Sequence, residues 1–221
     1  MIERILEPEV MDSVAEARDY DAMDHSTVNR VFVADFLAVW NRRSTILDVG
    51  TGTAQIPIEF CRQSPVGDIL GIDLAEQMLT LGRENVTKSN LDSRVRLENV
   101  NARAMPYRDG SFAAIMSNSI VHHIPEPRHV FAEIVRIAAP GATIFIRDLL
   151  RPTDAATLKH LVQIYAGDAN AHQQKMFAES LHAALTLEEV RAIVAAHGFD
   201  PIAAVQQTTD RHWTWSISSL A

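Results

Sequence analysis

The chain has 221 residues, enough for one α/β domain with a substantial core and too few for two of ordinary size. Its apolar fraction of 47% and charged fraction of 22% are those of a globular protein rather than a disordered one. The net charge of -8 argues against sequence-independent nucleic-acid binding, which relies on lysine and arginine to neutralise phosphates.

The sequence contains few signals for membrane targeting, disulfide bonds or metal binding. The first residues show no basic segment leading into an apolar one, and no apolar run approaches the length of a bilayer span. We therefore expect a cytoplasmic protein without stable membrane insertion. The single cysteine, Cys61, excludes an internal disulfide bond and a cysteine-cluster metal site.

The N-terminal part of the chain predicts helices, and the part after Thr45 predicts an α/β fold. Residues 7–22 are acidic and helical in character, and residues 27–40 form an amphipathic helix. Short apolar runs then alternate with amphipathic segments, which is typical of parallel strands joined by right-handed helical crossovers. The expected strands cover residues 45–49, 68–73, 95–100, 112–118 and 142–148, and the expected helices cover a segment opening just before Pro57 and ending near Ser64, then residues 75–89 and 128–138.

The C-terminal third predicts further helices and a hairpin. Residues 152–185 have little strand character and contain two expected helices, over 154–166 and 171–183. Thr186 and Glu189 have the spacing of a capping box, which opens a helix that stops at Gly198. Residues 202–208 and 212–218 are the last two expected strands, and we expect them to pair as an antiparallel edge hairpin. Trp213 and Trp215 then share one strand face, where they either fill the core or enclose an acceptor.

One short motif indicates the chemistry of the ligand. Asp48, Gly50 and Gly52 follow a buried apolar run, and the glycines let a ligand lie against the main chain. The dinucleotide fingerprint needs a further glycine where Gln55 stands, and no P-loop Gly-Lys-Ser/Thr follows the turn. A carboxylate at Asp48 suits a cationic ligand, and Asp73, at the end of the next run, could accept both hydroxyls of a ribose. Together the two acids predict an adenosine that carries positive charge.

A second polar group follows the strand over residues 112–118. Ligands of open parallel sheets bind beyond the carboxyl ends of the strands, so Asn118 and His123 are expected to face the site. We expect His122 to point into the loop instead. Neighbouring histidines point in different directions, and no Asp/Glu/His cluster nearby has zinc-ligand spacing, so we predict no metal.

From about Tyr20 to the C-terminus the sequence resembles the class I S-adenosylmethionine-dependent methyltransferases, in particular the small-molecule branch typified by ubiquinone/menaquinone methyltransferases. Four blocks in order carry the resemblance: Leu47 to Thr53, Gly71 to Leu79, Asn101 to Tyr107, and Phe112 to Asp148. The resemblance implies a doubly wound, Rossmann-like α/β fold. Its sheet has seven mostly parallel strands and an antiparallel C-terminal hairpin, covered by an N-terminal helical lid. The implied cofactor is S-adenosylmethionine, with S-adenosylhomocysteine as product.

The resemblance also implies a set of cofactor-binding residues: Tyr20, Asp48, Gly50, Gly52, Thr53, Asp73, Leu74, Met78, Asn101, Ala102 and Asn118. Tyr20 and His25 are lid residues by this analogy, although capping of a surface helix explains them as well. Met78 fits core packing as well as adenine contact. Asn101 stands where the family often has aspartate, and a turn-forming role is its alternative explanation.

We expect a single methyltransferase domain over residues 1–221. Residues 1–43 form its arm or lid, 44–150 the cofactor-binding core, 151–185 a helical insertion that covers the acceptor, and 186–221 the last helix and hairpin. The oligomeric state is left open.

Methyl transfer from a sulfonium is an in-line displacement, so the protein mainly aligns the acceptor and excludes water. His123, Asp148 and His25 are the candidate bases for an acceptor that must lose a proton. The run from His172 to Lys175 favours a small, polar acceptor. Two alternatives stay open, namely C-methylation of a quinone-type lipid and a non-catalytic scaffold that only binds the cofactor.

Overall fold

The computed structural model describes residues 2–6, 13–42 and 45–218. Part of the helix expected over residues 7–22 lies outside these ranges, and the described part forms α1 (Val14–Asp21). Contacts divide the described chain into two compact units. The first unit contains residues 13–42, 45–118, 129–146 and 216–218, and the second contains residues 2–6, 119–128 and 147–215.

Seven strands form one sheet in the order β3-β2-β1-β4-β5-β7-β6. Their bounds are β1 (Ile46–Val49), β2 (Ile69–Asp73), β3 (Val95–Asn99), β4 (Phe112–Asn118), β5 (Ala138–Leu149), β6 (Val205–Gln207) and β7 (His212–Ile217). Strand β1 runs parallel to both β2 and β4, β2 runs parallel to β3, and β6 pairs antiparallel with β7. The predicted seven-stranded, mostly parallel sheet with an antiparallel C-terminal hairpin is confirmed.

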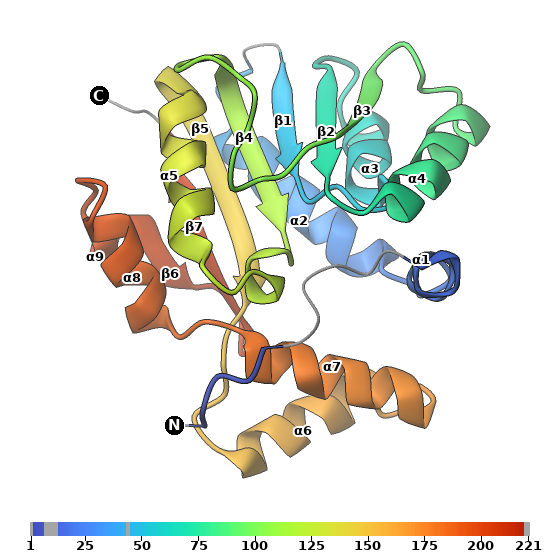
Figure 1. The fold of residues 1–221 in the computed structure, drawn as a ribbon, viewed down its shortest axis with the longest axis vertical. Helices are drawn as coiled ribbons and strands as arrows, with labels where there is room; N and C mark the ends of the chain where they lie inside the picture. The colour runs from blue at the N-terminus through green and yellow to red at the C-terminus, as the bar shows by residue number, and fades with distance from the viewer. Residues whose placement is uncertain (1, 7–12, 43–44, 219–221) are drawn as a thin grey trace. The chain divides into compact units, whose positions relative to one another are not determined.

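Helices pack on the sheet of the first unit because its central strands are apolar on both faces, and all four residues of β1 are buried. These helices are α2 (Ser26–Val39), α3 (Gln55–Gln63), α4 (Glu76–Lys88) and most of α5 (Pro127–Ile137), whereas α1 packs against α4 (Figure 1). Aromatic residues of α2 and α3, among them Phe32, Phe36 and Phe60, pack against Ile46 and Phe145 of the strands. Helix α3 opens shortly before Pro57, as predicted.

The second unit contains a short 3-10 turn, η1 (Val121–His123), and the helices α6 (Ala155–Ala166), α7 (Ala171–Ala183), α8 (Leu187–Ala195) and α9 (Pro201–Ala204). Helices α6 and α7 lie side by side (Figure 1) and pack through Leu161 and Leu181. The capping box of α8 is present between Thr186 and Glu189. None of the helices in the described ranges is long and apolar enough to cross a bilayer.

Two predicted boundaries are wrong. Residues 202–208 were expected as a strand, but the carboxylate of Asp200 accepts hydrogen bonds from Ile202 N and Ala203 N and starts α9, so β6 begins only at Val205. A proline at the first helical position supports this turn. Strand β5 begins at Ala138, four residues earlier than predicted.

Both tryptophans of β7, Trp213 and Trp215, are completely buried, which confirms the core interpretation for this strand.

Candidate functional site

The glycine-bearing turn after β1 is held against the neighbouring strand by its own backbone. Gly50 N and Thr51 N both donate to the Ile72 carbonyl, at 2.8 and 2.9 Å. Gly50 and Gly52 have φ values of 77° and 53°, a region that suits residues without a Cβ. Ala54, which also has a positive φ of 63°, ends the turn and caps α3. The turn is thus fixed in place while its face toward a ligand carries no side chain at either glycine.

Asp73 lies at the end of β2 with both carboxylate oxygens hydrogen-bonded to the main chain. Its Oδ2 accepts from Gly52 N at 2.8 Å, and its Oδ1 accepts from Ala75 N at 2.9 Å. The first bond ties this acid to the glycine turn, so the structure brings together two parts of the predicted cofactor site. Because a carboxylate offers about four lone-pair positions, the remaining ones could accept the hydroxyls of a ribose.

Asp48 is buried in β1, with 1% of its surface exposed. Burial raises the pKa of its carboxyl to about 7, the Thr51 hydroxyl partly offsets this, and the charge of Asp73 raises it further. A cation next to Asp48 would stabilise the ionised form. The hydroxyl oxygen of Thr53 is also buried, and it has no hydrogen-bond partner within the described residues. This part of the turn therefore offers polar atoms for a cationic ligand.

Helix α1 brings Tyr20 to the turn. A Cβ added at Gly52 would lie 3.9 Å from Cε1 of the Tyr20 ring, so the ring packs beside this glycine. Burial, together with the charges of Asp73 and Asp48, raises the pKa of the Tyr20 phenol to about 12, so the phenol stays neutral. The Tyr20 and His25 rings are 5.0 Å apart between centroids, and burial lowers the pKa of His25.

Of the residues expected to contact adenine, two lie on or just before α4. Leu74 directly follows Asp73 and is 39% exposed, which leaves an apolar side chain open to a ligand. Met78 is 6% exposed and packs in a cluster with Ala17 and Ala75. Met78 therefore packs in the core, and its contact with adenine stays a prediction.

The other expected contacts follow β3 and end β4. The Asn101 side-chain oxygen accepts from Arg103 N at 2.9 Å, so this residue forms a turn in the ligand-free chain. Ala102 beside it is buried. The Asn118 side-chain oxygen is buried and has no hydrogen-bond partner in the part of the chain that the structure describes. Their roles toward the cofactor stay predictions.

These features together fit an adenosine that carries a positive charge. The turn leaves room at Gly50 and Gly52, Asp73 is oriented for ribose hydroxyls, and the buried acid Asp48 lacks a cationic neighbour among the causes that set its pKa. The groups expected to hold the cofactor all lie in the first unit.

The second unit contains a buried histidine–carboxylate pair. His122 Nδ1 lies 2.6 Å from Asp148 Oδ1, and the two side chains are 4% and 1% exposed. The backbone N–H groups of Val121, His122 and Leu149 also donate to this carboxylate. Burial by itself would raise the pKa of Asp148, but the charge and hydrogen bond of His122, with the Leu149 N–H, hold it below its ordinary value.

The expectation that His122 points into the loop is wrong, because its ring is directed at Asp148. A proton on Nδ1, shared with a carboxylate, leaves the lone pair of the ring on Nε2, the arrangement of a general base. His123 has a different environment. Burial and the neighbouring His122 lower its pKa to about 3, which makes it a weak base at neutral pH.

Arg4, a residue that the sequence did not suggest, holds the turn that carries the two histidines. Its guanidinium donates to the carbonyls of His122, Ile124 and Pro125 at 3.4, 3.0 and 3.3 Å, and to the Ala183 carbonyl at 2.7 Å. These partners are up to 179 residues away in sequence. No local pattern could have revealed the contact.

The chain is similar to known methyltransferases. Residues 47–146 match the methyltransferase domain family. A 27-O-demethylrifamycin SV methyltransferase from Amycolatopsis mediterranei is 27% identical over 76% of this chain, which spans 59% of that relative's length. The ubiquinone/menaquinone biosynthesis C-methyltransferase UbiE of Geobacter sulfurreducens is 26% identical over 82% of this chain and 72% of its own.

Among solved structures, an S-adenosylmethionine-dependent methyltransferase from Aquifex aeolicus has the same fold. Its TM-score is 0.66 at 20% identity, over 92% of this chain and 97% of its own. The family match covers the glycine turn, Asp73 and β4, which are the elements that build the site. Residues 47–146 therefore form a methyltransferase domain, similar to that of the class I S-adenosylmethionine-dependent enzymes of the ubiquinone/menaquinone type, and the cofactor that this similarity indicates is S-adenosylmethionine.

Proposed function

We propose that this protein methylates a small molecule that must lose a proton from a hydroxyl group before it reacts. The single observation that carries this proposal is the buried pair of His122 and Asp148, with 2.6 Å between Nδ1 and Oδ1. A displacement on an activated methyl group needs little from the protein beyond alignment. A paired imidazole is useful when the acceptor is a poor nucleophile until it is deprotonated.

The first unit would hold the donor. Asp48 would face its positive charge, Asp73 would accept the ribose hydroxyls, and Tyr20 would cover the turn at Gly52. When bound, S-adenosylmethionine supplies a methyl group whose bond to sulfur breaks with the electron pair left on sulfur. Exclusion of water by the lid would prevent loss of the methyl group to hydrolysis.

The pair of His122 and Asp148 would handle the proton. His122 Nε2 takes the proton of the acceptor hydroxyl, and the Asp148 carboxylate stabilises the imidazolium that forms. The acceptor oxygen, or a ring carbon that its charge activates, then forms the new bond to the methyl group; a methylated ring carbon afterwards loses its hydrogen to water as a proton, and the electron pair of that C–H bond returns to the ring. The pKa of about 3 argues against His123 in this role, so His123 contributes shape rather than basicity. In this proposal Asp148 acts on the proton transfer through His122, and His25 stays an alternative base.

A second candidate is C-methylation of a quinone-type acceptor, which is the activity named for the Geobacter sulfurreducens relative. The same base would serve, because a deprotonated hydroquinone is nucleophilic at carbon as well as at oxygen. The sequence argument for a polar acceptor is weaker in the structure. Gln173 takes part in the capping box of α7, and Gln174 donates to the carbonyls of Gly167 and Ala169, so both amides serve the protein itself.

Two experiments test the proposal. Calorimetric titration with S-adenosylmethionine and with NAD should show saturable binding of the first alone; binding of NAD alone would end the proposal. Donor with a labelled methyl group, incubated with phenols, hydroquinones, amines, thiols and carboxylates, should label the hydroxyl-bearing classes, and mass spectrometry of the product would distinguish O- from C-methylation. Label on no acceptor would favour a non-catalytic scaffold. Cell fractionation tests the expected cytoplasmic location.

A further inference from the structure

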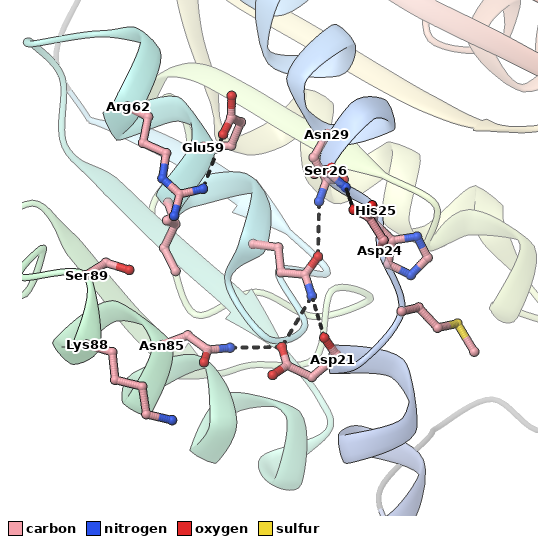
Figure 2. Close-up of a pocket in the computed structure, with 13 residues that line it drawn as sticks. Asp21, Asp24, His25, Ser26, Asn29, Glu59, Arg62, Asn85, Lys88 and Ser89 are labelled. Atoms are coloured by element: carbon pink, nitrogen blue, oxygen red, sulfur yellow. Dashed lines mark hydrogen bonds and ion pairs between the residues drawn. The ribbon is translucent and has the colours of Figure 1, made fainter.

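Two amide side chains from different helices converge on Asp21, the last residue of α1. Figure 2 shows the Asn85 side chain directed at Asp21. Gln55 Nε2 donates to the Asp21 carboxylate at 3.3 Å and lies 3.4 Å from the Asp21 carbonyl. Asn85 Nδ2 of α4 donates to the same carboxylate oxygen at 2.9 Å. We call Asp21, Gln55 and Asn85 the Asp21 clasp.

The clasp is also connected to the glycine turn. Asn85 Nδ2 lies 3.2 Å from the Thr53 carbonyl, so one side chain links the arm to the turn that receives the cofactor. Gln55 begins α3 directly after this turn, and its oxygen accepts from Asn29 of α2 at 3.2 Å. The residue that breaks the dinucleotide fingerprint is therefore the one that reaches the arm.

Tyr20 is the neighbour of Asp21 in the chain and lies beside Gly52. Any movement of Asp21 away from α3 and α4 must carry Tyr20 with it, because the two are consecutive residues of one helix. Apart from the clasp, α1 packs against α4 through a small apolar cluster that includes Ala17, Ala75 and Met78. The polar contacts at Asp21 are thus a substantial part of what holds the arm down.

The clasp forms a wall of an open polar cavity of about 310 Å³. Charged residues line much of it, among them Asp24, Glu59, Arg62 and Lys88 (Figure 2). Water in this cavity can compete for the amide and carboxylate groups of the clasp, which makes its hydrogen bonds reversible.

We propose that Gln55 and Asn85 are positioning residues for cofactor binding, which hold Asp21 and thereby keep Tyr20 over the turn. The clasp closes when both amides bind the carboxylate, and the arm opens when water replaces them. Donor and product then enter and leave at a rate that the clasp sets. This inference rests on the proposed binding of S-adenosylmethionine at the turn.

The test uses Gln55→Met and Asn85→Leu, which keep side-chain size and remove the amides. Gln63→Met is the matched control, because Gln63 lies on the same helix α3 but donates to the Arg30 carbonyl of α2 at 3.0 Å rather than to α1. Stopped-flow measurement with S-adenosylhomocysteine as the probe gives its association and dissociation rates. Hydrogen exchange of residues 14–21 reports arm opening independently of any ligand.

We expect dissociation to become faster by about 10–150-fold in each clasp variant, the range for one lost hydrogen bond to a charged group. Exchange of residues 14–21 should rise in parallel, and Asp21→Ala should reproduce both effects. The control should stay within twofold of the unchanged protein.

The inference is overturned if the clasp variants release the probe and exchange no faster than Gln63→Met. If the unchanged protein does not bind the probe at all, the proposed function fails first. Exchange in the clasp variants would then still show whether the amides hold the arm.

Discussion

The Asp48→Asn variant should show whether cofactor binding depends on the charge of this buried acid or only on the shape of its side chain. In the free protein, burial raises the pKa of Asp48 to about 7, so near neutral pH about half of the molecules carry a neutral side chain there. A cationic ligand favours the ionised form. Binding of S-adenosylmethionine should therefore release a proton, and its affinity should rise with pH.

The size of the effect follows from that pKa. Asp48 must be ionised before it can pair with a cation, and this requirement weakens the apparent affinity by about 11-fold at pH 6 and about 1.1-fold at pH 8. The affinity should therefore rise about tenfold, or about 1.4 kcal/mol, across this range. Calorimetry at pH 6, 7 and 8, in buffers of different ionisation enthalpy, measures both the affinity and the protons released. Asp48→Asn should bind more weakly at pH 8 and lose the pH dependence.

Stability should change in the opposite direction. The folded-state pKa of Asp48 lies above its unfolded value of about 3.9, so the folded state binds more protons and its stability falls as pH rises from about 4 to about 7. Asp48→Asn removes this penalty, which is at most about 4 kcal/mol above pH 7. Urea unfolding should show that the variant gains more stability over the unchanged protein at pH 8 than at pH 5, by about 2–3 kcal/mol.

Asp92→Asn is a suitable control, because Asp92 is exposed and accepts a hydrogen bond from the Thr87 hydroxyl. S-adenosylhomocysteine, which keeps the amino group but lacks the sulfonium charge, shows which cation Asp48 faces. Affinity for S-adenosylmethionine that stays flat between pH 6 and pH 8, with no proton released, would refute the reasoning.

Three further changes test other parts of the structure. His122→Gln should lower turnover by about 100-fold or more, because it removes the base that we propose beside Asp148. The affinity for S-adenosylmethionine, measured by calorimetry, should stay unchanged. An equal loss of turnover and of affinity would contradict this role. Arg4→Gln should lower the free energy of unfolding by about 1–3 kcal/mol in urea titrations, because it leaves backbone carbonyls without their hydrogen-bond donor. An effect no larger than that of Arg62→Gln, at an exposed arginine, would argue against this structural role of Arg4. Gly71→Ala should lower the free energy of unfolding by about 1–3 kcal/mol, because the added Cβ would lie 2.6 Å from the Thr51 hydroxyl oxygen. A stability equal to that of the unchanged protein would show that the turn moves to accommodate the methyl group.

The sequence by itself determined the elements whose signal is local. Ile46, Leu47 and Val49 are typical of a strand buried on both faces, and the glycines after it predicted a ligand-binding turn. The capping box at Thr186 identified the start of α8 in the same way. These patterns depend on residues a few positions apart, and their physical cause acts within one strand, turn or helix end.

Local pattern failed where a competing interaction decided the structure. Residues 202–208 have the apolar character of a strand, yet the Asp200 side chain caps the first N–H groups and turns residues 201–204 into a helix. The ring of His122 pairs with a carboxylate that lies 26 residues further along the chain, so its direction could not be read from its neighbours.

Only the tertiary structure decided which distant side chains meet. Arg4 reaches carbonyls more than 100 residues away, and Asp21 meets Asn85 across 64 residues. Such contacts form because packing of helices on the sheet buries the polar groups near one another, and each buried group must then find a hydrogen-bond partner. The expected type of cofactor follows from the residues around one turn, whereas the proposed base and the contacts proposed to hold the lid follow from how the chain folds back on itself.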